Sequence, residues 1–253
     1  MLKRLPYLML MLLAVLVVPL RASPPIGAVV QTWRYDSQAN TVTVRIVNAS
    51  QKDITAFNLS LKITYASAVS QYQWLRDLVN AAVLLDRFKG TANEHALRQE
   101  FGDGEIPIGG SHDEKISVQP GLVNFAAVLD VVAYSDKTAE ATNTAALQRL
   151  IDQRKAMALS IQKANEIVQS VISDPTVTHP HVAASTQVQK LLDAWRAKPH
   201  YDTLDMNEAE LVGIADELKQ TPPERLKTYI DLKEKERATW IGQAQLVKIG
   251  GQP

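Results

Sequence analysis

Cysteine is absent from the 253 residues of the sequence. Its absence excludes disulfide bonds, catalysis by a thiolate, zinc sites built on cysteine, and lipid attachment through an N-terminal cysteine. A protein that folds outside the cytoplasm without disulfides depends on its hydrophobic core, and a chain of this length is able to bury one. The sequence therefore predicts a fold held by packing.

An excess of charge of either sign is also missing, because 27 lysine and arginine residues balance 27 aspartate and glutamate residues. Three of the basic residues, Lys3, Arg4 and Arg21, lie at the N-terminus with no acid beside them. Without these three the chain has 24 basic and 27 acidic residues, a net charge of −3. A charge of this sign and size argues against binding to nucleic acid or to anionic lipid.

The N-terminus has the three parts of an export signal. Lys3 and Arg4 form a basic start, Tyr7–Val18 is an unbroken apolar run, and Pro19–Ala22 supplies a helix breaker and a small residue. We expect residues 1–22 to be removed as a signal peptide, which places the mature protein in the periplasm or outside the cell. The alternative is an uncleaved membrane anchor, but the run is shorter than the roughly 20 apolar residues that a spanning helix needs.

Alternation of apolar and polar residues predicts β-strands between residue 26 and about residue 140. The clearest strand places five apolar side chains on one face and polar ones on the other, as in a half-buried antiparallel sheet; the apolar five are Phe57, Leu59, Leu61, Ile63 and Tyr65. Leu122–Tyr134 is apolar on both faces, and we expect it to be a central strand partly covered by a helix. One of its faces is wholly apolar, with Val123, Phe125, Ala127, Leu129, Val131 and Ala133. The other predicted strands are Ala28–Tyr35, Thr41–Val47 and Lys115–Val118.

Residues 69–101 interrupt this β pattern and are predicted to be a helical insertion. Apolar residues recur there at helical spacing, and Gly90 is a suitable stop, so Val69–Phe88 is predicted to be a helix. The residues that follow this helix in the chain, up to Gly110, are predicted to be mainly loop. Insertions of this length between strands are often functional.

After Glu140 the composition favours helices, and four are predicted. Asn143 or Thr144 is expected to cap the first, Ala145–Ile172, whose apolar seam is interrupted by Arg154 and is expected to pack within the molecule. The second predicted helix is Val182–Ala197. The third is capped by Asp205 with Glu208 and ends near Gln220. The fourth has Thr221 as N-cap and Pro222 as its first residue, and Glu224 completes its capping box. The charged run Asp231–Trp240 is predicted to be a solvated face of the last helix.

Histidines are candidate metal ligands in a chain without cysteine. His179 and His181 lie on either side of Pro180, in a stretch whose extended backbone would turn both rings toward one cation. Asp174 and His200 are the additional ligands to consider. Zinc needs three or four ligands and no known metal spacing is present, so a loop that leads into a helix is the preferred interpretation.

Acidic residues stand out at two further points. Asp103 and Glu105 lie among four glycines, but the segment lacks the alternating carboxylates of a calcium loop and the lysine of a phosphate loop. A turn before a strand is the better interpretation. Asp130 is a carboxylate inside an apolar strand; if buried it needs a partner, and an arginine or backbone amides are commoner partners than a substrate. No serine lies in a Gly-x-Ser-x-Gly motif, so the catalytic residues, if there are any, stay unknown.

The β-rich half resembles bacterial immunoglobulin-like or fibronectin III-like β-sandwich modules of exported proteins. The residues that carry the resemblance are "VTVRIVNASQKDITAFNLSLKITY" and "IPIGGSHDEKISVQPG", which leads into the strand from Leu122. The resemblance covers residues 26–134 apart from the insertion, and it implies an antiparallel sandwich with an accessory or binding role. It transfers no functional residue, because such modules share a scaffold and not a site.

These observations predict an exported α+β protein: a signal peptide at 1–22, an immunoglobulin-like β-sandwich at 23–140 with the insertion 69–101, and an all-helical region at 141–253. The expected function is non-enzymatic binding or scaffolding in a bacterial cell envelope, with a protein partner and no cofactor. One alternative is a metal-dependent hydrolase that uses His179 and His181. Another is an accessory factor that contacts the membrane only through an uncleaved N-terminal segment.

Overall fold

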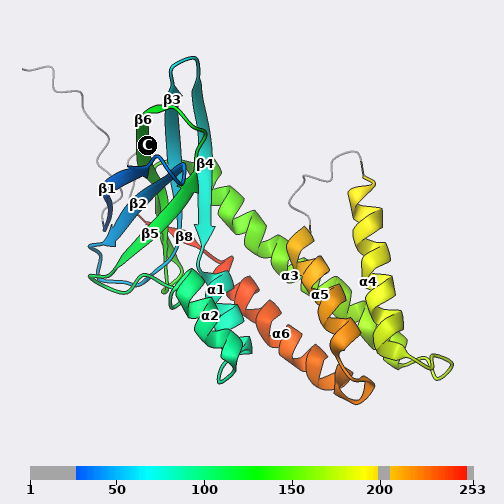
Figure 1. The fold of residues 1–253 in the computed structure, drawn as a ribbon. Coiled ribbons are helices and arrows are strands. Elements are labelled where there is room, and N and C mark those ends of the chain that lie inside the picture. Colours follow the sequence, from blue (N-terminus) through cyan, green and yellow to red (C-terminus); the bar gives the residue numbers. More distant parts are fainter. Residues whose placement is uncertain (1–26, 199–205, 250–253) are drawn as a thin grey trace, which may run out of the picture.

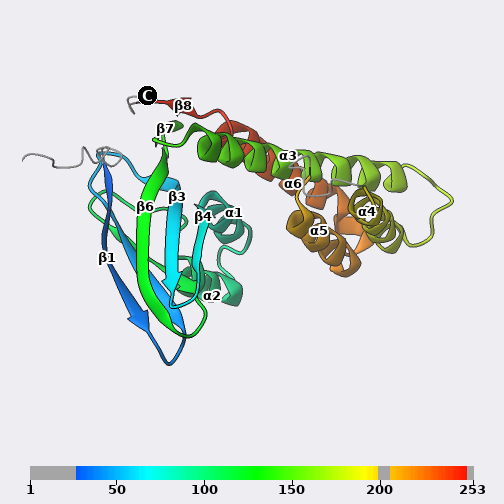
Figure 2. The same ribbon diagram turned by 90° about the horizontal axis from the view of Figure 1, so that it is seen from above.

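Two β-sheets and a group of long helices extending away from them make up the structure (Figure 1; Figure 2). The computed structural model describes residues 27–198 and 206–249. In this part of the chain six α-helices accompany two mainly antiparallel sheets, so the expected mixture of α and β structure is confirmed. The predicted signal peptide lies outside the described residues, as do His200 and Asp205.

The first sheet has three antiparallel strands in the order β1-β2-β5, and the second has five in the order β4-β3-β6-β7-β8. Among the strands of the described residues, only β7 and β8 pair in parallel. The strands are β1 Ala28–Asp36, β2 Thr41–Asn48, β3 Ile54–Tyr65, β4 Val69–Asp77, β5 Ser111–Ser117, β6 Leu122–Tyr134, β7 Thr138–Ala141 and β8 Val247–Lys248. All five strands predicted from alternation are confirmed, although β5 begins four residues earlier than Lys115.

The two sheets enclose one hydrophobic core. From the first sheet, β2 contributes Val42, Val44 and Ile46, all without solvent exposure. From the second, β3 contributes the predicted row of apolar side chains, which are Phe57, Leu59, Leu61 and Ile63, while Tyr65 is only half-buried. The alternation that marks these strands in the sequence therefore follows one buried face, as expected for antiparallel sheets with one wet side.

Strand β6 is central in its sheet, as predicted, but its apolar residues do not share one face. The pairing with β3 slips by one residue at Asp130, because Leu59 pairs with Leu129 and Asn58 with Val131. Leu129 consequently packs in the core between the sheets, whereas Val131 packs on the other side, under a helix. Such a bulge re-aims side chains along a strand. The prediction of a single apolar face is wrong, and Val123 is 65% exposed.

The predicted helix Val69–Phe88 is wrong in its first half. Val69–Asp77 is strand β4, which forms a hairpin with β3 in a register that pairs Tyr72 with Leu61 and Trp74 with Leu59. The helical spacing of apolar residues arose by coincidence, and the free edge of β3 decides the structure. Helix follows only in α1, Val79–Arg87, and the predicted loop contains a second helix, α2, Ala92–Phe101.

The C-terminal helices are close to those predicted. Their bounds are α3 Thr144–Ile172, α4 Pro180–Arg196, α5 Glu208–Gln220 and α6 Leu226–Gln243. Asn143 caps α3 by accepting a hydrogen bond from the amide of Ala146. Asn207, and not Asp205, caps α5 by accepting from the amide of Glu210. The predicted capping box of α6 is wrong, because the Thr221 hydroxyl donates to the Glu217 carbonyl and a short 3-10 turn precedes the helix.

The helices pack on one another and on the edge of the second sheet. A core of about twenty buried side chains joins α3, α4, α5 and α6, and includes Val79 and Val83 from α1. A separate apolar cluster fixes the start of α3 against the sheet; it contains Val131, Ala133, Ala139, Ala141, Leu147 and Leu150. Strand β8 follows α6 in the chain and pairs with β7 of the second sheet. The C-terminal segment is therefore helical except at its last described residues.

An ion pair between the two sheets predicts a pH dependence of stability. Glu114 on β5 is fully buried and accepts two hydrogen bonds from Arg76 on β4, at 2.7 and 2.8 Å. Burial opposes its charge, but hydrogen bonds from His112 and Arg76 outweigh burial and hold the pKa of Glu114 below its ordinary 4.5. The ionised Glu114 carboxylate therefore contributes its full stabilisation of the fold above pH 4.5, and this contribution is lost as pH falls through the folded-state pKa.

We expect Glu114→Gln to lower the free energy of unfolding at neutral pH by about 1–3 kcal/mol, because Arg76 loses its charged acceptor. The difference from the wild type should shrink as pH falls through the folded-state pKa of Glu114, below which both chains are neutral at this position. Urea unfolding at a series of pH values measures it. A difference that stays constant over this range would contradict the role of the Glu114 charge.

Candidate functional site

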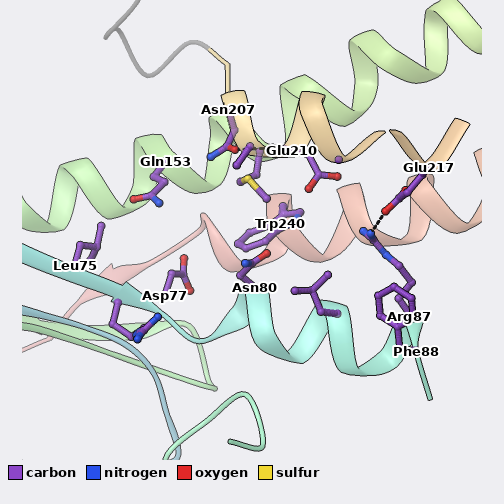
Figure 3. A pocket seen from close by; sticks show the side chains of 15 residues that line it. Leu75, Asp77, Asn80, Arg87, Phe88, Gln153, Asn207, Glu210, Glu217 and Trp240 are labelled. Atoms are coloured by element: carbon purple, nitrogen blue, oxygen red, sulfur yellow. Dashed lines mark hydrogen bonds and ion pairs between the residues drawn. The ribbon is translucent and has the colours of Figure 1, made fainter. Parts of the chain in front are cut away.

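A cleft of about 510 Å³ lies where the second sheet meets the helices. The end of β4 and helix α1 form one side, and α3, α5 and α6 form the others (Figure 3). The strand-to-helix step at Asp77 places the last side chains of β4 and the first turns of α1 along the same wall. Small-molecule sites in proteins have volumes of roughly 300–1,000 Å³, so this cleft is large enough to hold a ligand.

A buried ion pair builds the wall nearest the sheet. The guanidinium of Arg154, on α3, donates to both carboxylate oxygens of Asp77 at 2.8 and 3.0 Å and to the carbonyl of Gln243 at 2.6 Å. The Arg154 side chain has no solvent exposure and that of Asp77 is 7% exposed. Asp77 also accepts a hydrogen bond from the Val79 amide at the start of α1. One carboxylate and one arginine thus connect β4, α1, α3 and the end of α6.

Arg154 was predicted to be an interruption of an apolar seam, and the structure gives it a specific partner. An arginine cannot be left unpaired in a helical seam that packs against a protein core. That requirement was readable from the sequence, but the identity of the partner was not, because Asp77 is 77 residues away in the chain.

A second group of charges occupies the other end of the cleft. Arg87, at the end of α1, forms a bidentate ion pair with Glu236 of α6 at 2.6 and 2.7 Å and also pairs with Glu217 of α5. Lys233 of α6 lies 3.1 Å from both Glu210 and Glu217 and 3.3 Å from Glu236. Burial alone would lower the pKa of Arg87, but the surrounding carboxylates raise it above the ordinary value. We call these five residues the ion cluster.

The ion cluster overturns the prediction that Asp231–Trp240 is a solvated face. Lys233 is 1% exposed and Glu236 is 5% exposed, so both belong to the interior. Tyr229 extends the cluster by donating its hydroxyl proton to Glu217 at 2.9 Å. Its pKa is raised, first by burial and then by the charge of Glu217, so the phenol stays neutral.

Three further side chains offer unused hydrogen-bonding groups to the cleft. The amides of Asn80 and Gln153 make no hydrogen bond with another described residue. Trp240 is 2% exposed, and its indole N–H likewise has no partner in the described chain, yet it is not sealed from solvent. Figure 3 shows Trp240 between Asn80 of α1 and Glu210 of α5, in the middle of the cleft. Polar groups placed in this way serve to orient a bound molecule.

The histidines considered as metal ligands lie away from this cleft. His179 and His181 occupy the N-terminus of α4, in the part of the helical region farthest from the sheets (Figure 1), with ring centroids 6.4 Å apart. Asp174 accepts hydrogen bonds from the amide and hydroxyl of Thr176 at 2.9 and 2.7 Å. Within residues 27–198 and 206–249, no three histidine or acidic side chains are grouped so that they could hold a metal ion.

The remaining acidic candidates have structural partners. Asp103 pairs with Arg98 of α2. Glu105 has a raised pKa, caused mainly by burial and then by nearby Asp53 and Asp103. Asp130 is 8% exposed and accepts a hydrogen bond from the hydroxyl of Ser60, so its partner is neither the arginine nor the backbone amide considered above. None of these residues lines the cleft.

The chain matches no protein-family model, no curated protein and no solved structure. Among the helices of the described segments, none combines the length and the apolar composition that a membrane crossing requires. Inference about function therefore depends on the chemistry of the cleft itself.

The side chains around the cleft are suited to binding. Its lining includes no serine, threonine, cysteine or histidine among the described residues, so neither the common nucleophiles nor the commonest general base face it. Asp77 and Arg87 are held in ion pairs that include short charge-assisted hydrogen bonds. Asn80, Gln153 and Trp240 provide the free hydrogen-bonding groups.

Removing Arg154 should destabilise the protein more than removing both members of its pair. We expect Arg154→Met to lower the free energy of unfolding by about 3–5 kcal/mol, because it leaves the Asp77 carboxylate buried without a counter-charge. Asp77→Asn combined with Arg154→Met removes that charge and keeps an oxygen that can accept from the Val79 amide. Urea unfolding should show the double variant to be the more stable of the two. Equal stabilities would mean that the Asp77 carboxylate costs no free energy when it is left without Arg154.

Proposed function

We propose that the protein is a non-enzymatic binding protein of the bacterial cell envelope, and that the cleft between β4, α1, α3, α5 and α6 is its binding site. The observation that carries this proposal is a ligand-sized cleft whose walls present unpaired amide and indole groups beside paired charges. The helices that carry these groups are already fixed by caps and ion pairs, so the walls of the cleft need little ordering when a ligand arrives, which favours affinity.

The proposed location outside the cytoplasm rests on the N-terminal sequence. The basic start, apolar run and small residue at 1–22 favour export through a signal peptide. The partner we propose is another protein of the envelope, since the net charge offers no basis for binding nucleic acid. Contact with the membrane would require that the N-terminal segment stay uncleaved.

We further propose that the β-rich half is an immunoglobulin-like module that presents the cleft. Two mainly antiparallel sheets around one core support this assignment. The second sheet differs from such a module by its short terminal strand β8, which comes from the end of the chain and pairs in parallel. The helices that complete the cleft would then be additions to a common scaffold, which agrees with the rule that function resides in sites grafted on folds.

Gly213, on the α5 wall, allows the cleft to be filled without disturbing the core. A Cβ atom added at this residue would meet no other atom within 4 Å, and the residue lies in regular helix. Gly213→Phe should occupy the cleft, whereas the matched control Gly213→Ala should leave it open. Both should fold, and the alanine variant should gain up to about 1 kcal/mol of stability from helix propensity.

Thermal-shift screening of envelope peptides and small molecules tests the binding proposal. We expect the ligands that stabilise the wild type to stabilise Gly213→Ala equally and to lose their effect on Gly213→Phe. Native mass spectrometry of each complex would confirm the stoichiometry. The cleft is not the binding site if every ligand found stabilises the phenylalanine variant as much as the alanine variant.

Export has its own test. We expect the protein made in a bacterium to carry an N-terminus near Ser23, because the apolar run is short and is followed by Pro19 and Ala22. Intact-mass measurement of the protein from the periplasmic fraction would establish this. A mass that retains Met1, in a membrane fraction, would favour the tethered alternative.

A further inference from the structure

The ion cluster at one end of the cleft does not balance its charges. Arg87 and Lys233 supply two positive charges, and Glu210, Glu217 and Glu236 supply three negative ones. Their side chains are between 1% and 29% exposed, so water screens them only in part. A buried group of charges is most stable when each one is compensated, and here one carboxylate charge is left over.

The rest of the cleft does not supply the missing positive charge. Arg76 is paired with Glu114, and Asp77 is paired with Arg154, so each of these neighbours is already neutralised. Of the three carboxylates, those of Glu210 and Glu217 face the cleft, whereas Glu236 does not line it, so the excess negative charge is available to a ligand at Glu210 and Glu217.

An independent observation indicates that a ligand belongs beside these carboxylates. The indole of Trp240 is almost completely buried, faces the same cleft, and has a donor N–H that no described residue accepts (Figure 3). The N–H is open to solvent within the cleft, so the acceptor of a bound molecule can take the place of water there. The amides of Asn80 and Gln153 lie on the same cleft and can both donate and accept.

We infer that the cleft binds a molecule with a positively charged nitrogen at the Glu210–Glu217 end and hydrogen-bond acceptors beside Trp240 and Asn80. A lysine or arginine side chain on an extended peptide has this chemistry, because its backbone carbonyls supply the acceptors. A free amine or guanidine shares the cationic part. The inference rests on the proposed function, since it names the ligand class of the same cleft.

Titration calorimetry with short peptides tests the inference. The probe is an end-blocked Gly-Lys-Gly peptide, its neutral comparison is the same peptide acetylated on the lysine nitrogen, and 1,5-diaminopentane represents a free amine. Glu210→Gln removes the surplus charge and leaves Lys233 two carboxylates. Glu208→Gln makes the same change two residues earlier on α5, where Glu208 pairs with exposed Arg196 outside the cleft, and is the matched control.

We expect the lysine peptide to bind the wild type and Glu208→Gln equally, and Glu210→Gln at least about tenfold more weakly, as for loss of one charge-assisted hydrogen bond. Acetylation of the peptide should have an effect of the same size. Tighter binding of the peptide than of 1,5-diaminopentane would identify a protein segment as the source, and equal binding would identify a free amine. The inference would be overturned if acetylation of the peptide, or Glu210→Gln in the protein, left the measured affinity unchanged.

The Gly213 variants separate this inference from the proposed function. If only neutral or anionic ligands bind, and Gly213→Phe abolishes their binding, the cleft is a binding site and the cationic assignment is wrong. If the lysine peptide binds Gly213→Phe as well as Gly213→Ala, the site is elsewhere and both proposals fail. Thermal unfolding of Glu210→Gln and Glu208→Gln ensures that a loss of affinity is not a loss of folding.

Discussion

The buried ion pair between Asp77 and Arg154 is the contact on which the arrangement of this molecule depends. Asp77 is the last residue of an edge strand, and its carboxylate also accepts from the first turn of α1. Arg154 reaches it from α3 and holds the end of α6 through the Gln243 carbonyl. A buried carboxylate or guanidinium without its partner would cost much free energy, so each charge requires the other. This requirement fixes the end of β4, the start of α1, α3 and the end of α6 relative to one another. The wall of the cleft is the result.

The ion cluster at the opposite end works in a similar way but is not complete. Arg87 binds α5 and α6 to α1, and Lys233 lies among three carboxylates. Where the first pair is neutral, this cluster carries an extra negative charge beside a cleft. A protein that needed only a rigid interface would gain nothing from such an excess, whereas a binding protein gains selectivity by leaving one charge for its ligand.

Structural features that depend on residues close together in the sequence could be predicted, and contacts between residues far apart in the sequence could not. The row Phe57 to Ile63 predicted the buried face of β3, and Asn143 predicted the start of α3, because each depends on neighbours within a few residues. The helix predicted at Val69–Phe88 failed because the edge of β3 overrode local spacing. The cleft could not be predicted, since the ion pairs of Arg87 with Glu236 and of Arg154 with Asp77 span 149 and 77 residues. The lone Arg154 in an apolar seam was the one available signal.

Hydrogen exchange of Arg154→Met tests most directly whether the Asp77–Arg154 pair holds the cleft together. We predict that amides at the end of β4, the start of α1 and the end of α6 lose protection together, since each contacts the pair. Amides of β2 and β5, which belong to the core between the sheets, should lose only as much protection as the lower free energy of unfolding accounts for. An even loss of protection over the whole chain, or faster exchange only at the amides of α3 around residue 154, would show that the pair does not hold the cleft together.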